Sequence, residues 1–132
     1  MDIAFGIRRR VFMEEQGVPE EIEMDDMDAS ATHIICKAGG EAVATGRLNF
    51  FGREAKMGRV AVLKEWRNRG VGSKVVVFLL EEAGKHGTEV VYANVQTHSK
   101  DFYLKHGFKV TGDIFLEADI EHVRMEKSLL VL

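Results

Sequence analysis

The fold is decided by the stretch Arg59-Val60-Ala61-Val62-Leu63-Lys64-Glu65-Trp66-Arg67-Asn68-Arg69-Gly70-Val71-Gly72. Its apolar start over residues 59–63 predicts a β-strand, and a helical pattern with apolar residues at four-residue spacing follows over residues 71–86. The glycine-containing segment between them therefore predicts a loop that leads from a strand into a helix.

The composition of this loop predicts an anion site. The first backbone N–H groups of a helix have no partners inside it, and the helix macrodipole adds about half a positive charge at that end. Gly70 and Gly72 allow close approach of the backbone, and Arg67 and Arg69 add positive charge. The Lys-Ser/Thr pair of a Walker loop and the three glycines of the dinucleotide fingerprint are both absent. A diphosphate ligand is expected, and a purely structural turn is the alternative.

Residues 67–72 follow the pattern Arg/Gln-x-x-Gly-x-Gly/Ala, which resembles the pyrophosphate loop of the GNAT superfamily of acyl-CoA N-acetyltransferases. A second similarity lies further along the chain. Asn94 stands on an expected strand, and Phe102-Tyr103-x-x-x-Gly107-Phe108 follows on an expected helix, as in the second signature of that superfamily. The resemblance covers residues 2–127.

The resemblance implies acetyl-CoA as cosubstrate and no metal. The backbone N–H of Val62 would polarise the thioester carbonyl, and Tyr103 would give a proton to the departing thiolate, since a phenol with a pKa near 10 is protonated at neutral pH. An aromatic packing role is the alternative for Tyr103. The residues implied in coenzyme binding are Val60, Ala61, Val62, Arg67, Asn68, Arg69, Gly70, Val71, Gly72, Ser73, Asn94 and Tyr103.

The sequence lacks one catalytic group that many GNAT enzymes have. They carry a glutamate just before the strand segment Arg-Val-Ala-Val, and Gly58 stands at that position here. His98 and His122 are substitutes as general base, because an imidazole titrates near pH 6.5, although a lone histidine is more often structural. Water, or carboxylates near the acceptor pocket, could accept the proton instead.

Residues 14–28 carry eight carboxylates and neither Lys nor Arg. Like charges at this density favour a solvated loop. The alternative is an acidic lip beside the acceptor pocket, which would attract a cationic amine. A calcium loop is not supported, because Asp26 and Asp28 lack the further ligands and the glycine at the required spacing.

The remaining segments predict an α+β fold in a single domain, residues 1–132. Residues 2–16 form an amphipathic helix, and residues 31–38 and 41–50 form a hairpin around Gly39-Gly40. A parallel strand over 89–96, a helix over 99–106 and a hairpin of residues 109–113 and 120–129 around the connection 115–119 complete the chain. The result is a GNAT-like mixed, mostly antiparallel sheet with helices on both faces.

The small bacterial GNAT proteins carry a strand before their first helix, and in this sequence the strand is expected to be missing, because the first expected helix begins at residue 2. The sheet edge near residues 31–38 is therefore expected to lack a neighbour, and we expect a homodimer or another association there.

Charge and cysteine content limit the classes of function. The 132 residues are 45% apolar and 30% charged with a net charge of −3, which gives no general attraction to nucleic acid. Arg8-Arg9-Arg10 is expected to be a solvated helix face. Cys36 is expected to be a small buried hydrophobe, with an acyl-carrying nucleophile as the alternative. With no apolar stretch of about 18 residues, no membrane association and a cytoplasmic location are expected.

The sequence predicts an N-acetyltransferase that moves an acetyl group from acetyl-CoA to a primary amine of a small molecule by direct transfer in a ternary complex. A non-catalytic acyl-CoA-binding module is the first alternative, favoured by the missing glutamate. A protein or peptide N-acetyltransferase is the second. The acceptor is not specified by the sequence.

Overall fold

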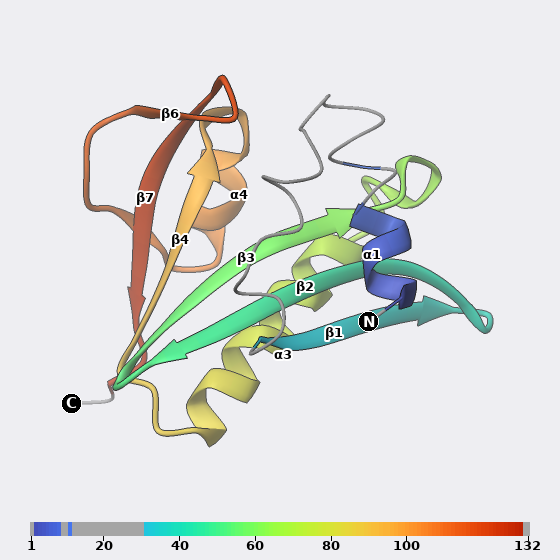
Figure 1. The fold of residues 1–132 in the computed structure, drawn as a ribbon, viewed down its shortest axis with the longest axis horizontal. Helices are drawn as coiled ribbons and strands as arrows, with labels where there is room; N and C mark the ends of the chain where they lie inside the picture. The colour runs from blue at the N-terminus through green and yellow to red at the C-terminus, as the bar shows by residue number, and fades with distance from the viewer. Residues whose placement is uncertain (1, 9–10, 12–30, 131–132) are drawn as a thin grey trace.

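The structure is a computed structural model that describes residues 2–8, 11 and 31–130. The chain forms one sheet flanked by helices (Figure 1). The expected continuation of the first helix to residue 16 and the acidic segment 14–28 lie outside the described residues. The elements are α1 (Asp2–Arg8), β1 (Thr32–Ala38), β2 (Glu41–Phe51), β3 (Glu54–Val62), η3 (Lys64–Trp66), α3 (Val71–Lys85), β4 (Val90–Gln96), η4 (Thr97–Ser99), α4 (Lys100–Lys105), β5 (Lys109–Val110), β6 (Phe115–Glu117) and β7 (Ile120–Ser128).

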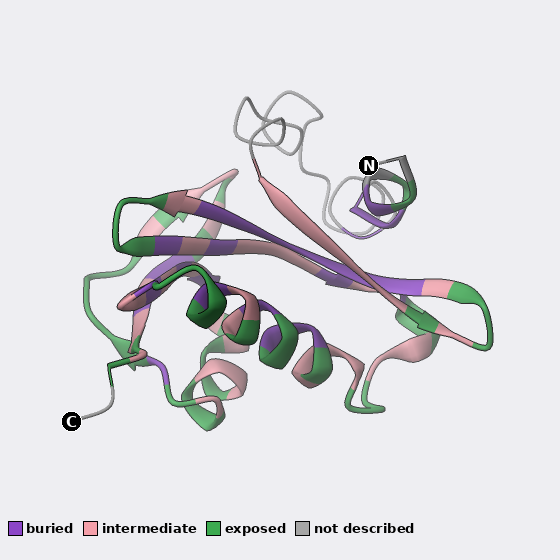
Figure 2. Ribbon diagram, turned by 90° about the horizontal axis from the view of Figure 1, so that it is seen from below, coloured by how far each residue is buried: buried purple, intermediate pink, exposed green. Residues whose placement is uncertain are grey.

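The seven strands of the described residues form a single sheet with the order β1-β2-β3-β4-β7-β5, and β6 also pairs with β7. The pair β3 and β4 is parallel, because the helix α3 connects these strands. The helix α1 covers one face and α3 covers the other (Figure 2). The predicted mixed, mostly antiparallel sheet with helices on both faces is confirmed.

The sheet opens between its two parallel strands. In β2 and β3, Thr45 pairs with Ala61 and Arg47 pairs with Gly58, so two residues of β3 oppose one residue of β2. This extra residue is a β-bulge, and Arg59 within it has a φ of 51°. Pairing of β3 with β4 covers only residues 54–56, and the strands then diverge (Figure 1). A bulge bends its strand, so β3 turns away from β4 beyond this point.

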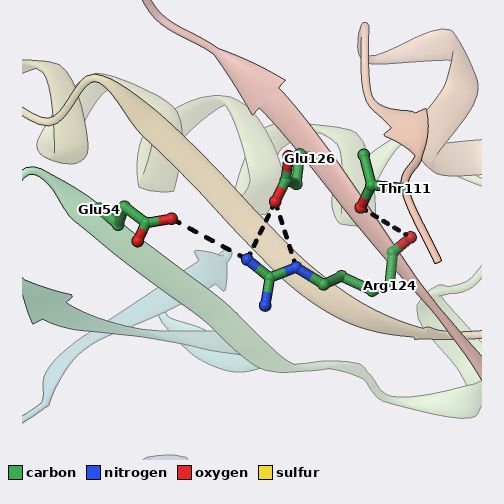
Figure 3. A network of polar contacts seen from close by, with 4 residues as sticks. All are labelled: Glu54, Thr111, Arg124 and Glu126. Carbon is green, nitrogen blue, oxygen red and sulfur yellow. Dashed lines mark hydrogen bonds and ion pairs between the residues drawn. The ribbon is translucent and has the colours of Figure 1, made fainter.

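A network around Arg124 lies at the closed end of this opening (Figure 3). Its guanidinium lies 4.0 Å above the ring of Tyr92 on β4. One nitrogen, Nη2, is 2.9 Å from a carboxylate oxygen of Glu126 on β7 and 3.9 Å from one of Glu54 on β3. Arg124 therefore connects the three strands where β3 and β4 are still paired.

The main core lies between the sheet and α3, and one glycine permits the close packing. A Cβ at Gly46 of β2 would lie 2.8 Å from both Val75 Cγ1 and Leu79 Cδ1 of α3. The fully or nearly buried members of this core are Ala44, Leu48, Ala55, Met57, Val75, Val76, Leu79, Ala83, Val91, Ala93, Val95, Phe108, Val123 and Met125. Phe102 and Tyr103 of α4 pack against it.

A smaller core lies under α1 and corrects one expectation. Ile7 and Val11 pack against Ala61 and Leu63 of the β3 region. Arg8, which was expected on a solvated face, is only 1% exposed. The reason is its position: residues 4, 7, 8 and 11 share one helix face, and that face lies on the sheet.

The C-terminal part contains one strand that the sequence patterns did not predict. The connection expected over residues 115–119 includes β6, which pairs with β7 through a two-residue turn. Ala118 and Asp119 in this turn have φ values of 52° and 60°, as a primed hairpin turn requires. Such turns usually contain glycine or asparagine, so an Ala-Asp turn gave little signal in the sequence.

Candidate active site

A cavity of about 560 Å³ lies where β3 and β4 diverge. Its walls come from both strands, the loop before α3, η4, α4 and the β6–β7 turn. Val11 near α1 lines it from one face of the sheet, and Phe102 of α4 lines it from the other. The cavity therefore extends through the open sheet.

Most of the predicted site residues meet in this cavity. Those that line it are Val60, Ala61, Val62, Arg67, Asn68, Gly72, Asn94 and Tyr103. Arg69, Gly70, Val71 and Ser73 belong to the same loop and first helical turn, and they are not among the residues that line it. Their predicted contacts with a coenzyme stay predictions.

The loop before α3 is held by its own side chains. Arg67 Nε donates a hydrogen bond to the Val62 carbonyl at 3.0 Å, and the Arg69 guanidinium lies 5.0 Å from the centre of the Trp66 ring. Gly70, with a φ of 78°, is the residue before the helix, and no side chain caps this end. The first N–H groups of α3 consequently have no partner from a capping side chain.

Val62 presents its backbone to the cavity side of β3. The N–H of the next residue, Leu63, donates to the Val43 carbonyl of β2 at 2.9 Å. Successive backbone groups of a strand point to opposite edges, so the N–H of Val62 points away from β2. This is the orientation that the predicted contact with a thioester carbonyl needs.

Tyr103 is packed between aromatic rings at the cavity wall. Its ring makes edge-to-face contacts with Phe102 and Phe108, with centroid distances of 5.1 Å and 5.5 Å. Burial raises the pKa of Tyr103 to about 12. The phenol therefore remains protonated and can donate a hydrogen bond throughout the neutral range.

Ser73, in the first turn of α3, contacts the end of α4. Its Oγ lies 3.1 Å from Nε2 of His106. Partial burial, and secondarily the charge of Lys127, lower the pKa of His106. The lowered pKa favours the neutral imidazole in this contact, which joins the start of α3 to the residue after α4.

The two histidines considered as general base both line the cavity, in different settings. His98 on η4 is exposed, whereas His122 on β7 is buried. His122 Nε2 lies 3.5 Å from a carboxylate oxygen of Glu117. Sequence reasoning missed Glu117, because the turn that directs it to His122 has no glycine.

Further expectations about chemistry concern residues outside this cavity. Cys36 on β1 is half-buried and packs against the main core, away from the residues that line the cavity. Within residues 2–8, 11 and 31–130, no group of three or more His, Cys, Asp or Glu side chains could hold a metal ion. None of the helices among these residues is long and apolar enough to cross a membrane.

Comparison with known proteins agrees with this geometry. The family described as "Acetyltransferase (GNAT) domain" matches residues 6–129. The chain belongs to the GNAT acetyltransferase family. The uncharacterized N-acetyltransferase YjcF of Bacillus subtilis is 37% identical over 126 residues, which are 95% of this chain and 90% of YjcF. The match to the family and to this relative confirms the predicted family and the prediction of an acetyl-CoA-dependent acyltransferase.

Solved GNAT structures share the fold. An acyl-CoA N-acyltransferase of Pseudomonas aeruginosa superimposes with a TM-score of 0.86 at 26% identity, covering 96% of this chain and 89% of that one. A Bacillus subtilis acetyltransferase in complex with coenzyme A superimposes with a TM-score of 0.77, covering 98% of this chain and 93% of that one. At 18% identity, the second similarity concerns the fold alone.

Proposed function

We propose that this GNAT protein transfers the acetyl group of acetyl-CoA to a primary amine of a small molecule, directly and within a ternary complex. One observation carries the proposal: a single cavity through the open sheet is lined by the Val62 backbone, the start of α3 and Tyr103. Acetyl-CoA lying along this cavity would have its pyrophosphate at the start of α3 and its thioester beside the Val62 N–H and the Tyr103 hydroxyl.

Acetyl-CoA would bind along the α3 side of the opening. Its pyrophosphate fits the loop of residues 67–72 and the first N–H groups of α3, where positive charge and unpaired donors favour an anion. Its pantetheine arm would run between the diverging strands, past Val60 and Asn94. The B. subtilis acetyltransferase with this fold, solved with coenzyme A, supports the choice of ligand.

The reaction would use these groups in sequence. A neutral amine attacks the thioester carbon, and the N–H of Val62 stabilises the oxygen that becomes negative. The carbon–sulfur bond then breaks, and the hydroxyl of Tyr103 gives its proton to the thiolate. Because the cavity is lined from both faces of the sheet, donor and acceptor can occupy it together, and Cys36 lies outside it.

Release of free thiol from acetyl-CoA, measured with a panel of amines, tests this proposal. The panel contains small primary amines and, as a separate arm, peptides with free N-termini and lysines. Initial rates with the best acceptor should give intersecting double-reciprocal lines, and no acetylated protein should accumulate. Faster turnover of peptides would favour protein N-acetylation, and binding of acetyl-CoA with hydrolysis alone would favour a binding module.

A further inference from the structure

His122 is a buried imidazole whose proton is fixed on one nitrogen. Only 6% of the residue is exposed, and it still lines the cavity. Its Nδ1 lies 2.7 Å from the Ile120 carbonyl oxygen, and a carbonyl can only accept a hydrogen bond. The proton of the neutral ring is therefore on Nδ1, and the lone pair is on Nε2. The Phe115 ring stacks on the imidazole at a centroid distance of 5.9 Å and fixes its plane.

Glu117 is the only carboxylate among the described residues that line the cavity. The β6–β7 turn places it 3.5 Å from His122 Nε2. The remaining charged or titratable side chains in the lining are Arg47, Lys56, Arg59, Arg67, His98 and Tyr103. Among the described residues that line the cavity, Glu117 therefore offers a cation its most favourable position, beside His122.

His122 and the proposed acyl donor lie on opposite sides of the open sheet. Val123, the next residue of β7, belongs to the core under α3, and successive side chains of a strand point to opposite faces. The imidazole consequently lies on the α1 side, while Phe102 and Tyr103 approach from the core on the α3 side. An amine held by His122 would face the thioester across the opening.

We propose that His122 is the general base of the acetyl transfer and that Glu117 binds the acceptor as its ammonium ion. The assignment rests on the proposed acetylation of an amine. His122 would take the role of the glutamate that many GNAT enzymes carry at the position of Gly58. His98 is less suitable, because it is exposed and, in the described part of the chain, no hydrogen bond orients its ring.

The proton balance of the step is complete without another reactant. The ammonium gives one proton to Nε2 of His122, and Glu117 stabilises the imidazolium that forms. The nitrogen lone pair then forms the C–N bond, the C–S bond breaks with its electron pair on sulfur, and the thiolate takes the proton of Tyr103. The nitrogen loses a second proton, which restores Tyr103, and His122 releases its own to solvent.

The first experiment compares His122→Asn with His98→Asn, using ethylamine as the acceptor probe. Asparagine keeps a donor near the position of Nδ1 and lacks Nε2. We expect His122→Asn to lower kcat at least about 100-fold and to remove the acidic limb of the kcat/KM profile, with coenzyme A affinity unchanged by calorimetry. His98→Asn should stay within about threefold of the parent protein. Glu117→Gln should raise the KM for ethylamine about tenfold and also lower kcat, by less than His122→Asn does, because Glu117 also stabilises the imidazolium.

Two results would overturn the assignment. In the first, His122→Asn retains the acidic limb of its kcat/KM profile and at least a third of the parent kcat. In the second, His98→Asn loses both the acidic limb and most of the parent kcat. Failure of the parent protein to acetylate ethylamine and every other amine of the panel, while it binds coenzyme A, would overturn the proposed function, and the base with it. If His122→Asn does not fold, long-range ¹H–¹⁵N spectra of the parent protein decide. They should show His122 with its proton on Nδ1 and a bare Nε2 at pH 8, and a proton on Nε2 there would refute the proposal.

Discussion

The proposed role of Tyr103 as general acid depends on its hydroxyl group alone, so one substitution can test it directly. Replacing it with phenylalanine keeps the contacts with Phe102 and Phe108 and removes only the hydroxyl. If this hydroxyl protonates the thiolate, kcat and kcat/KM should fall together, by about 10²-fold, the low end for general acids, because a thiolate is already a good leaving group. Stopped-flow thiol release under conditions where chemistry limits the rate measures this loss.

The free energy of unfolding of Tyr103→Phe at high pH gives an independent test of the burial of the hydroxyl. Because burial raises the pKa of Tyr103 to about 12, the unfolded chain loses this proton near pH 10 and the folded chain does so later. The stability that Tyr103 contributes is therefore complete below pH 10 and is lost as the pH rises towards 12. Urea titrations should show a smaller alkaline loss for Tyr103→Phe. Turnover within about twofold of the parent would make Tyr103 a packing residue.

Gly70 tests the diphosphate site at the same scale. Gly70→Asp places a carboxylate before α3, where the coenzyme pyrophosphate is expected, and should abolish measurable coenzyme A binding. Gly70→Asn is the matched control, because asparagine has the same size, tolerates the φ of 78° equally well and carries no charge. Calorimetry should show weakened binding for asparagine and none for aspartate. Equal affinity of the two variants would exclude a diphosphate at this loop.

At the scale of elements, sequence patterns predicted most of the regular strands and helices, but they did not predict the β-bulge at Arg59 or the strand β6. The expected strands and helices agree with the observed ones to within one or two residues over 31–51 and 71–106, because their periodicity and glycine turns are strong signals. The strand β3 begins at Glu54, five residues before the apolar run 59–63 that predicted it. The bulge at Arg59 and the strand β6 have no such signal. Both depend on pairing with a distant strand, and the opening of the sheet and the position of Glu117 depend on them.

The packing of α3 on β2 gives an element-scale prediction. Gly46→Ala adds a methyl group 2.8 Å from Val75 and Leu79, so the helix must move or the side chains must leave their rotamers. We expect a loss of about 1–3 kcal/mol in the free energy of unfolding, measured by urea denaturation. Gly84→Ala is the control, because it has no neighbour within 4 Å and lies inside α3, where alanine should stabilise by about 0.5–1 kcal/mol. Similar effects of both substitutions would show that the α3–β2 contact is loosely packed.

At the scale of the whole molecule, the edge of the sheet gives the last prediction. In the part of the chain that the structure describes, β1 is the outer strand and β2 is its only neighbour (Figure 1). An outer strand presents backbone donors and acceptors to a further strand. We therefore expect two copies of the chain to pair through β1 at high micromolar concentration, with concentration-dependent protection of β1 amides in hydrogen exchange.

Sedimentation velocity with a second variant separates this edge from a competing surface on α3. Val77 and Phe78 of α3 are 45% and 58% exposed, and both line one shallow, mostly apolar surface depression on this helix. The helix α3 lies on the opposite side of the sheet from α1 (Figure 2). Phe78→Ser should leave the dimer unchanged if β1 forms the interface. If Phe78→Ser abolishes the dimer, the interface includes α3 rather than β1. If the parent protein is a monomer at every concentration, no second copy pairs with β1. Because the cavity lies between β3 and β4, neither interface should change the KM for acetyl-CoA.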